Sequence, residues 1–155
     1  MKNKNIVLKK TTINDIFFIN KWINNSVVRK YSFNKKKISK EKNKLFWNKN
    51  LNSKNFLSYT MFFKEKKLKA CGFFSANLYQ KYCLINYLIA PKFRNMGLSK
   101  FLLKLGVKKI NNYKIDIKIF AKVKKNNIRS IISLHSAKFI IYQEKKNYIK
   151  MIFKK

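Results

Sequence analysis

A strand, a short loop and a helix follow one another in the middle of this chain, and the loop carries an arginine and a glycine. Residues 83–90 form an apolar run of strand length that ends at Pro91, which has no N–H group for a β-ladder. From Leu98 onward, apolar residues recur at helical spacing with lysines between them. The first turn of such a helix has unpaired N–H groups, and Gly97 leaves room for a ligand to approach the backbone. The segment 94–99 is therefore predicted to bind an anion.

This loop resembles the pyrophosphate-binding loop of the GCN5-related N-acetyltransferase (GNAT) superfamily, in which glutamine or arginine is followed three residues later by glycine. Arg94 and Gly97 hold those positions, and Ser99 stands where glycine or alanine is usual. The resemblance implies that acetyl-CoA is the co-substrate. The residues that it assigns to the coenzyme in this loop are Arg94, Asn95, Met96, Gly97, Leu98 and Ser99. It also implies that backbone groups of Ile89 contact the pantetheine arm.

The segment that follows resembles the next block of the superfamily. Residues 115–122 alternate apolar and polar side chains for much of their length, which predicts a half-buried strand. Asn127 and Phe139 fall at the matching offsets, and Asn127 is expected either to contact the coenzyme or to cap the following helix. Two positions depart from the pattern: Lys138 replaces a glycine, and Leu134 replaces the tyrosine that often serves as the general acid.

The general acid and the general base must then come from other residues. His135, the only histidine, adjoins the position of the missing tyrosine, so it is predicted as catalytic, with Tyr142, Tyr87 and Ser133 as further candidates for the acid. The carboxylates of the chain are Asp15, Glu41, Glu65, Asp116 and Glu144. Glu41 lies in the region where the superfamily builds its acceptor site and is predicted as catalytic. An ordered water, or no protein base at all, is the alternative.

Residues 22–29 carry a Trp-x-Asn-x-x-x-Val-Arg pattern. It resembles the branch that acetylates nucleotide-linked amino sugars and ribosomal protein N-termini. Trp22, Arg29 and Trp47 would shape the acceptor pocket; core packing of both tryptophans and a surface ion pair for Arg29 are the alternatives.

We therefore expect an enzyme that moves an acetyl group from acetyl-CoA to a small acceptor with a primary amine, foremost a nucleotide-linked amino sugar. A protein or ribosomal N-terminus is the second candidate. The rival from another class is a catalytically degenerate, basic RNA- or ribosome-binding module, which the two departures from the pattern and the lysine content favour.

The net charge of +33 is extreme for 155 residues, but its make-up argues against a base-reading protein. Only Arg29, Arg94 and Arg129 among the 38 basic residues are arginines, whereas base recognition relies on arginine. Lysine, asparagine, isoleucine and phenylalanine are over-used together, which indicates an A/T-rich genome. Nucleic-acid binding is therefore expected to be non-specific, while the charge favours acidic ligands such as the coenzyme or a nucleotide sugar.

The chain is predicted to be one N-acetyltransferase domain over residues 1–155, an α/β protein with a mixed sheet and the order β-α-α-β-β-β-α-β-α-β-β. Cys71 and Cys83 lie in apolar runs without metal-ligand spacing, so buried thiols and no metal site are expected. The first ten residues lack the apolar core of a signal peptide, and no apolar run approaches the roughly 20 residues of a membrane span. A cytoplasmic location without membrane partners is the expectation.

Overall fold

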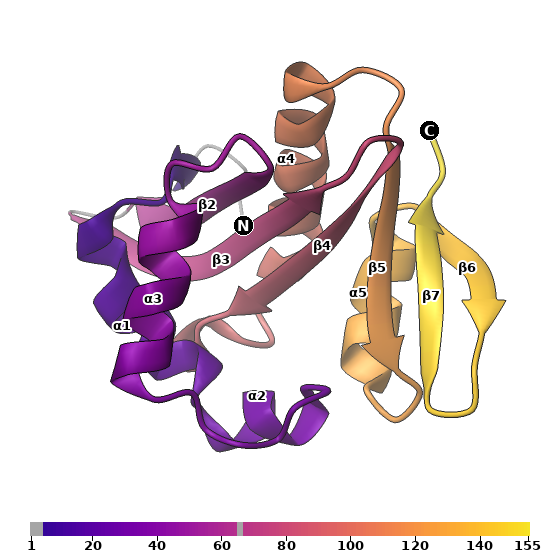
Figure 1. The fold of residues 1–155 in the computed structure, drawn as a ribbon. Coiled ribbons are helices and arrows are strands. Elements are labelled where there is room, and N and C mark those ends of the chain that lie inside the picture. Colours follow the sequence, from indigo (N-terminus) through magenta and orange to yellow (C-terminus); the bar gives the residue numbers. More distant parts are fainter. Residues whose placement is uncertain (1–4, 65–66) are drawn as a thin grey trace.

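The computed structural model describes residues 5–64 and 67–155, and in these ranges a seven-stranded sheet carries helices on both faces (Figure 1). The strands are β1 (Ile6–Lys10), β2 (Phe56–Lys64), β3 (Leu68–Leu78), β4 (Tyr82–Ile89), β5 (Lys118–Lys124), β6 (Phe139–Glu144) and β7 (Tyr148–Phe153). The α-helices are α1 (Ile16–Ile23), α2 (Ser26–Tyr31), α3 (Lys40–Asn50), α4 (Leu98–Tyr113) and α5 (Ile128–Ser136), and η2 (Ile13–Asp15) and η3 (Pro91–Phe93) are short 3-10 helices. The mixed α/β fold is therefore confirmed.

The strands lie in the order β1-β2-β3-β4-β5-β7-β6, with β4 and β5 parallel and all other neighbours antiparallel. The parallel pairing is short: it runs from Tyr82 opposite Lys118 to Ile85 opposite Ala121. Beyond it, β4 continues to Ile89 paired with β3, and β5 continues paired with β7. The two strands part after these four pairs, so the backbone groups on their facing edges have no ladder partner there (Figure 1).

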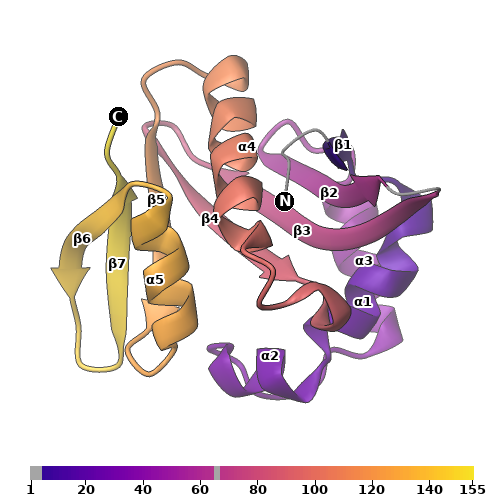
Figure 2. The same cartoon turned by 180° about the vertical axis from the view of Figure 1, so that it is seen from behind.

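Each face of the sheet has its own apolar core. Helices α4 and α5 cover one face, where Phe74 and Leu102 are fully buried (Figure 2). Helices α1 and α3 cover the other face near β2 and β3, where Ile19 and Trp47 form a smaller core with Phe73 (Figure 1). Successive residues of a strand point to opposite faces, so the neighbours Phe73 and Phe74 serve the two different cores.

Two elements differ from the sequence prediction. The strand predicted at 115–122 begins only at Lys118, because Asp116 adopts a left-handed backbone conformation (φ 61°) that turns the chain and leaves Ile115 80% exposed. Helix α2 is not predicted, since a helix of six residues is too short to show a repeating apolar face. The polar run Lys64-Glu65-Lys66-Lys67 predicts a hairpin turn between two strands, and its residues 65–66 lie outside the described residues.

Both cysteines are buried free thiols, as expected. Burial raises the pKa of Cys71 and of Cys83 to about 12, so neither forms a reactive thiolate near neutral pH.

Over residues 5–64 and 67–155, no helix combines the length and the apolarity needed to cross a membrane. The same ranges hold no group of three or more metal-ligating side chains.

Gly106 allows α4 to lie close to β3, and this contact gives a first prediction. A Cβ atom at Gly106 would lie 2.5 Å from Cδ2 of Phe74, whose ring is fully buried. Gly106→Ala should therefore lower the free energy of unfolding by about 1–3 kcal/mol, the usual cost of overpacking, measured by urea denaturation. Lys108→Ala, on the exposed side of the same helix, should change it by less than about 0.5 kcal/mol. Equal stability of the two variants would contradict this account of the packing.

Candidate functional site

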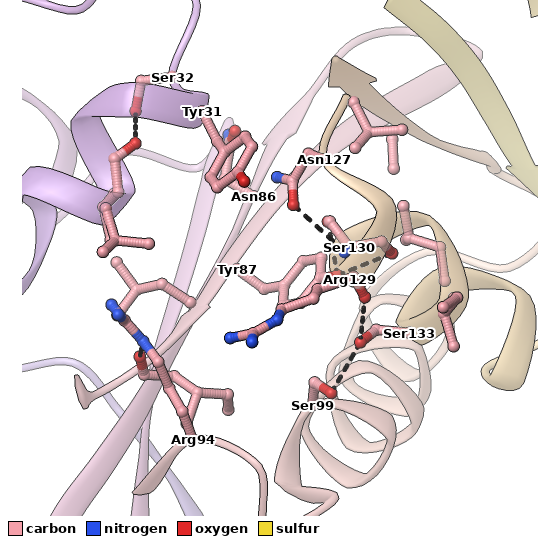
Figure 3. Close-up of a pocket in the computed structure, with 18 of the residues that line it drawn as sticks. Tyr31, Ser32, Asn86, Tyr87, Arg94, Ser99, Asn127, Arg129, Ser130 and Ser133 are labelled. Atoms are coloured by element: carbon pink, nitrogen blue, oxygen red, sulfur yellow. Dashed lines mark hydrogen bonds between the residues drawn. The ribbon is translucent and has the colours of Figure 1, made fainter. Parts of the chain in front are cut away.

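The parting of β4 and β5 opens a cleft of about 700 Å³. Its walls are the separated ends of the two strands, helix α2 on one side, helix α5 on the other, and the loop that leads into α4. Figure 3 shows Tyr31 of α2 and Ser32, which follows this helix, across the cleft from Ser130 and Ser133 of α5, with Tyr87 of β4 between them. A cleft bordered by unpaired strand edges can hydrogen-bond a ligand through the backbone.

Most residues assigned to the coenzyme lie along this cleft. Those that line it are Ile89, Arg94, Asn95, Gly97, Leu98, Ser99 and Asn127. Met96 is 40% exposed and is not part of the lining. Gly97 is the N-cap of α4 with φ 69°, a conformation that glycine adopts without strain, and a Cβ there would have no atom within 4 Å. The start of α4 therefore faces open space, as an anion site requires. Asn127 caps α5, since its Oδ1 accepts a hydrogen bond from the Ser130 amide at 3.3 Å.

All three arginines of the chain lie on the cleft. Arg94 donates through Nε to the carbonyl oxygen of Ile89 at 3.4 Å and through a terminal nitrogen to Oδ1 of Asn25 at 3.3 Å. Burial, and after it the positive charge of Arg129, lower the pKa of the Arg94 guanidinium. The described residues that line the cleft include no carboxylate to offset these charges. The site therefore suits a ligand with several negative charges. Arg129 is not predicted as a site residue from the sequence, although the scarcity of arginine in this chain is a signal that points to it.

Arg29 holds the chain that follows α2. It donates to the carbonyl oxygens of Asn34 at 3.2 Å and Lys36 at 3.1 Å, and to Oγ of Ser32 at 2.8 Å. These partners are backbone and hydroxyl oxygens rather than a carboxylate. Burial lowers the pKa of the Arg29 guanidinium, and its Nε is buried without a hydrogen-bond partner. Arg29 thus fixes one wall of the cleft and retains one free donor.

A second cavity of about 480 Å³ adjoins the cleft, between α1, α3, β3 and β4. The two cavities share Val28, Arg29, Ser32, Asn86, Tyr87 and Leu88. Trp47 lines the second cavity, is 2% exposed, and keeps its Nε1 buried without a partner. Trp22 packs on Phe18 at a ring distance of 4.9 Å and is not part of either lining. Arg29 and Trp47 therefore lie on the second cavity, while half-buried Trp22 packs against the smaller core.

Tyr87 lies at the junction of the two cavities and begins a row of hydroxyl groups. Its hydroxyl is 2.8 Å from Oγ of Ser130 and donates to the Ser130 carbonyl oxygen at 3.2 Å. Burial raises the pKa of Tyr87, and hydrogen bonds with Ser130 and Ser133 partly oppose this. Oγ of Ser133 is 2.9 Å from Oγ of Ser99 on α4. Two pairs of hydroxyls, Tyr87 with Ser130 and Ser133 with Ser99, thus lie along the cleft (Figure 3).

The structure does not bring the two residues predicted as catalytic to these cavities. His135 is exposed in the last turn of α5, whereas its neighbour Leu134 is 1% exposed and lines the cleft. Glu41 is exposed in the first turn of α3, where hydrogen bonds from its own backbone and from Ser39 lower its pKa and so weaken it as a base. Tyr142 is 58% exposed on β6, away from both linings.

The other carboxylates have structural partners. Asp15 is buried and accepts a hydrogen bond from Thr60 Oγ1 at 3.1 Å. Asp116 and Glu144 each pair with a surface lysine. Glu65 lies outside the described residues. Among the carboxylates that the structure describes, none lines either cavity.

Comparisons with known proteins agree with this architecture. The model of the Acetyltransferase (GNAT) family matches residues 24–137, more than half of the chain. Spermidine N-acetyltransferase from Vibrio cholerae, in complex with CoA and spermine, has a TM-score of 0.84 at 15% identity and covers 97% of this chain and 95% of its own. A domain from Methanocaldococcus jannaschii gives a TM-score of 0.83 at 20% identity, with coverages of 95% and 96%.

Campylobacter jejuni N-acetyltransferase PseH, in complex with acetyl coenzyme A, gives a TM-score of 0.70 at 17% identity, with coverages of 97% of this chain and 99% of its own. At identities of 15–20%, the similarity to these three structures shows that the fold is shared. No curated protein sequence matches the chain. The family match over residues 24–137 places the chain in the GNAT family, and it is an acetyl-CoA-dependent N-acetyltransferase.

Proposed function

We propose that the protein acetylates the primary amine of a nucleotide-linked amino sugar, with acetyl-CoA in the cleft between β4 and β5 and the acceptor in the adjoining cavity. The observation that carries this proposal is the chemistry of the second cavity. The described residues around it include the cations Arg29 and Lys42 and no carboxylate. A polycationic amine would find no countercharge there, whereas a phosphate-bearing acceptor would.

Two further features support an acceptor rich in oxygen atoms. Nε of Arg29 and Nε1 of Trp47 are buried donors without partners, and a buried donor left unpaired costs free energy. Because both nitrogens are closed off from solvent, a sugar or nucleotide oxygen would reach either of them only if the cavity wall moves on binding. Aromatic side chains of Phe46, Trp47 and Phe56, which pack edge to face on one another, also line this cavity and give it an apolar wall for a sugar or a base. The Trp22-to-Arg29 pattern is compatible with a ribosomal or other protein N-terminus, which stays the second candidate.

The proposed coenzyme site uses the cleft residues in separate roles. The N–H groups at the start of α4, with Arg94 and Arg129, would hold the pyrophosphate. The unpaired edge of β4 from Asn86 to Ile89 would hydrogen-bond the pantetheine arm and the oxygen that gains charge during transfer. No carboxylate in the lining is placed to take the proton of the amine, so the acceptor would lose it to water.

Replacing arginine by lysine tests the anion site without changing the net charge. Because only arginine offers a planar, two-pronged donor set, Arg94→Lys and Arg129→Lys should each weaken acetyl-CoA binding by about tenfold or more. Isothermal titration calorimetry at about 0.1 M salt, where the Debye length is about 10 Å, measures this directly.

Lys92→Ala is the matched control, since this exposed lysine lies on η3 outside the lining. It removes a full charge near the loop and should change the dissociation constant less than about twofold. If Lys92→Ala weakens binding as much as Arg94→Lys, diffuse positive charge holds the coenzyme and the assigned site is refuted.

The acceptor class is tested by thiol release from acetyl-CoA with a panel of amines. We expect kcat/KM for a nucleotide-linked amino sugar to exceed that for the free amino sugar, for spermidine and for a peptide N-terminus by about tenfold or more, because only the first supplies phosphates. Ellman's reagent can follow the thiol, since Cys71 and Cys83 are fully buried and their thiols do not contribute. A preference for spermidine would overturn the nucleotide-sugar proposal, and a preference for the peptide would favour the second candidate.

Trp47→Phe tests the role of the unpaired Nε1–H donor of Trp47 at the second cavity. It keeps an aromatic ring and removes Nε1–H, so the acceptor KM should rise about three- to tenfold while acetyl-CoA affinity stays unchanged. An unchanged acceptor KM would show that Nε1 makes no hydrogen bond to the acceptor.

A further inference from the structure

Departure of the coenzyme thiolate requires a proton donor, and the family position for it is an aliphatic side chain here. Leu134 lines the cleft but cannot donate a proton. Its neighbour His135 is exposed and lies outside both linings. The donor must therefore come from another element of the cleft.

We propose that Tyr87 is the general acid that protonates the leaving thiolate, an inference that rests on acetyl-CoA occupying the cleft as proposed above. Among the tyrosines that the structure describes, Tyr87 alone lines both cavities, and its hydroxyl is held beside Ser130 on the cleft. It comes from β4, on the opposite side of the cleft from Leu134 on α5. In this chain the phenol is thus on strand β4, whereas the family pattern has a tyrosine at the position of Leu134 on α5.

The surroundings of Tyr87 suit this role. The titratable groups on the same cleft are Arg29, Tyr31, Arg94, Lys122, Lys124 and Arg129. Burial, which raises the pKa of Tyr87, keeps the phenol protonated and able to donate at neutral pH. The hydrogen bond with Ser130 at 2.8 Å fixes the hydroxyl at the cleft wall. A positioned acid that remains protonated is what the leaving group requires.

Acetyl transfer with Tyr87 as the acid balances in bonds, electron pairs and protons. The nitrogen lone pair of the neutral amine forms the C–N bond, and the carbonyl π pair moves to oxygen. When that pair returns, the C–S bond breaks, its electrons pass to sulfur, and sulfur takes the proton from the Tyr87 hydroxyl. The nitrogen releases one proton to water, and water returns one proton to the phenolate. The products are the amide and the free thiol, with no net change in the enzyme.

A binding cycle tests the contact without any acceptor. Coenzyme A and desulfo-coenzyme A, which lacks the sulfur, are titrated calorimetrically into wild-type protein and Tyr87→Phe. We expect the wild type to bind coenzyme A about three- to tenfold more tightly than the desulfo analogue, and Tyr87→Phe to bind both equally within about twofold. The same preference in both proteins would overturn the contact between Tyr87 and the sulfur.

Kinetics test the chemical role. Tyr87→Phe should lower kcat about 100-fold or more with the KM for acetyl-CoA changed less than about twofold, the pattern of a lost general acid. Ser130→Ala removes the contact between the two hydroxyls but keeps the phenol and its bond to the Ser130 carbonyl oxygen, so its kcat should fall about tenfold at most. Tyr142→Phe, on β6 outside both linings, should leave kcat unchanged.

The outcomes separate this inference from the proposed function. A loss in Ser130→Ala equal to that in Tyr87→Phe would make the tyrosine structural, and an unchanged kcat in Tyr87→Phe would overturn its role. Lack of transfer to any amine by the wild type would overturn the proposed function, whereas the binding cycle would still report the contact of Tyr87 with sulfur.

Discussion

The separation of β4 from β5 after four residue pairs is the constraint on which the site depends. Both strands keep their outer partners, so the sheet remains continuous while its centre opens. The exposed edges place backbone donors and acceptors along a cleft that α2, α5 and the loop before α4 complete. The hydrogen bond from Tyr87 on β4 to Ser130 on α5 spans this opening and links its two walls. One side chain thus links the two walls of the cleft and is also the acid that we propose for the reaction.

The positions of the three arginines show where side-chain geometry, rather than the lysine-rich composition, determines which basic residue is present. The basic side chains are overwhelmingly lysine, yet Arg29, Arg94 and Arg129 all line one cleft. Lysine supplies a point charge equally well on an open surface, so composition can drift there at little cost. A guanidinium that must donate in several directions has no such substitute: Arg29 contacts Asn34, Lys36 and Ser32 simultaneously. Rare arginines in a lysine-rich chain therefore indicate positions where geometry, rather than charge, is under constraint.

What the sequence predicts well is local. The strand, loop and helix around Gly97 follow from adjacent residues, and the structure has them at the expected places. The partners of Tyr87 and of Arg129 depend on which strands separate and how α5 packs, which no local pattern records. The prediction that His135 is catalytic shows the same limit. Consecutive helical residues point about 100° apart, so when Leu134 faces the cleft, His135 turns to solvent.

The net charge of +33 and the selectivity of the site are separate matters. A positive surface attracts the coenzyme, a nucleotide sugar and RNA alike, and at physiological salt its field decays over about 8 Å. It can therefore raise encounter rates but cannot distinguish one anion from another. Discrimination has to come from groups that a ligand meets only inside the cavity, where buried donors make a mismatched partner costly. Nε1 of Trp47 is such a group because it is uncharged, buried and unpaired. In the proposed function, a hydrogen bond from this nitrogen to the acceptor would be less sensitive to salt than the field of the lysine surface, so the cavity wall would supply the selectivity that surface charge cannot.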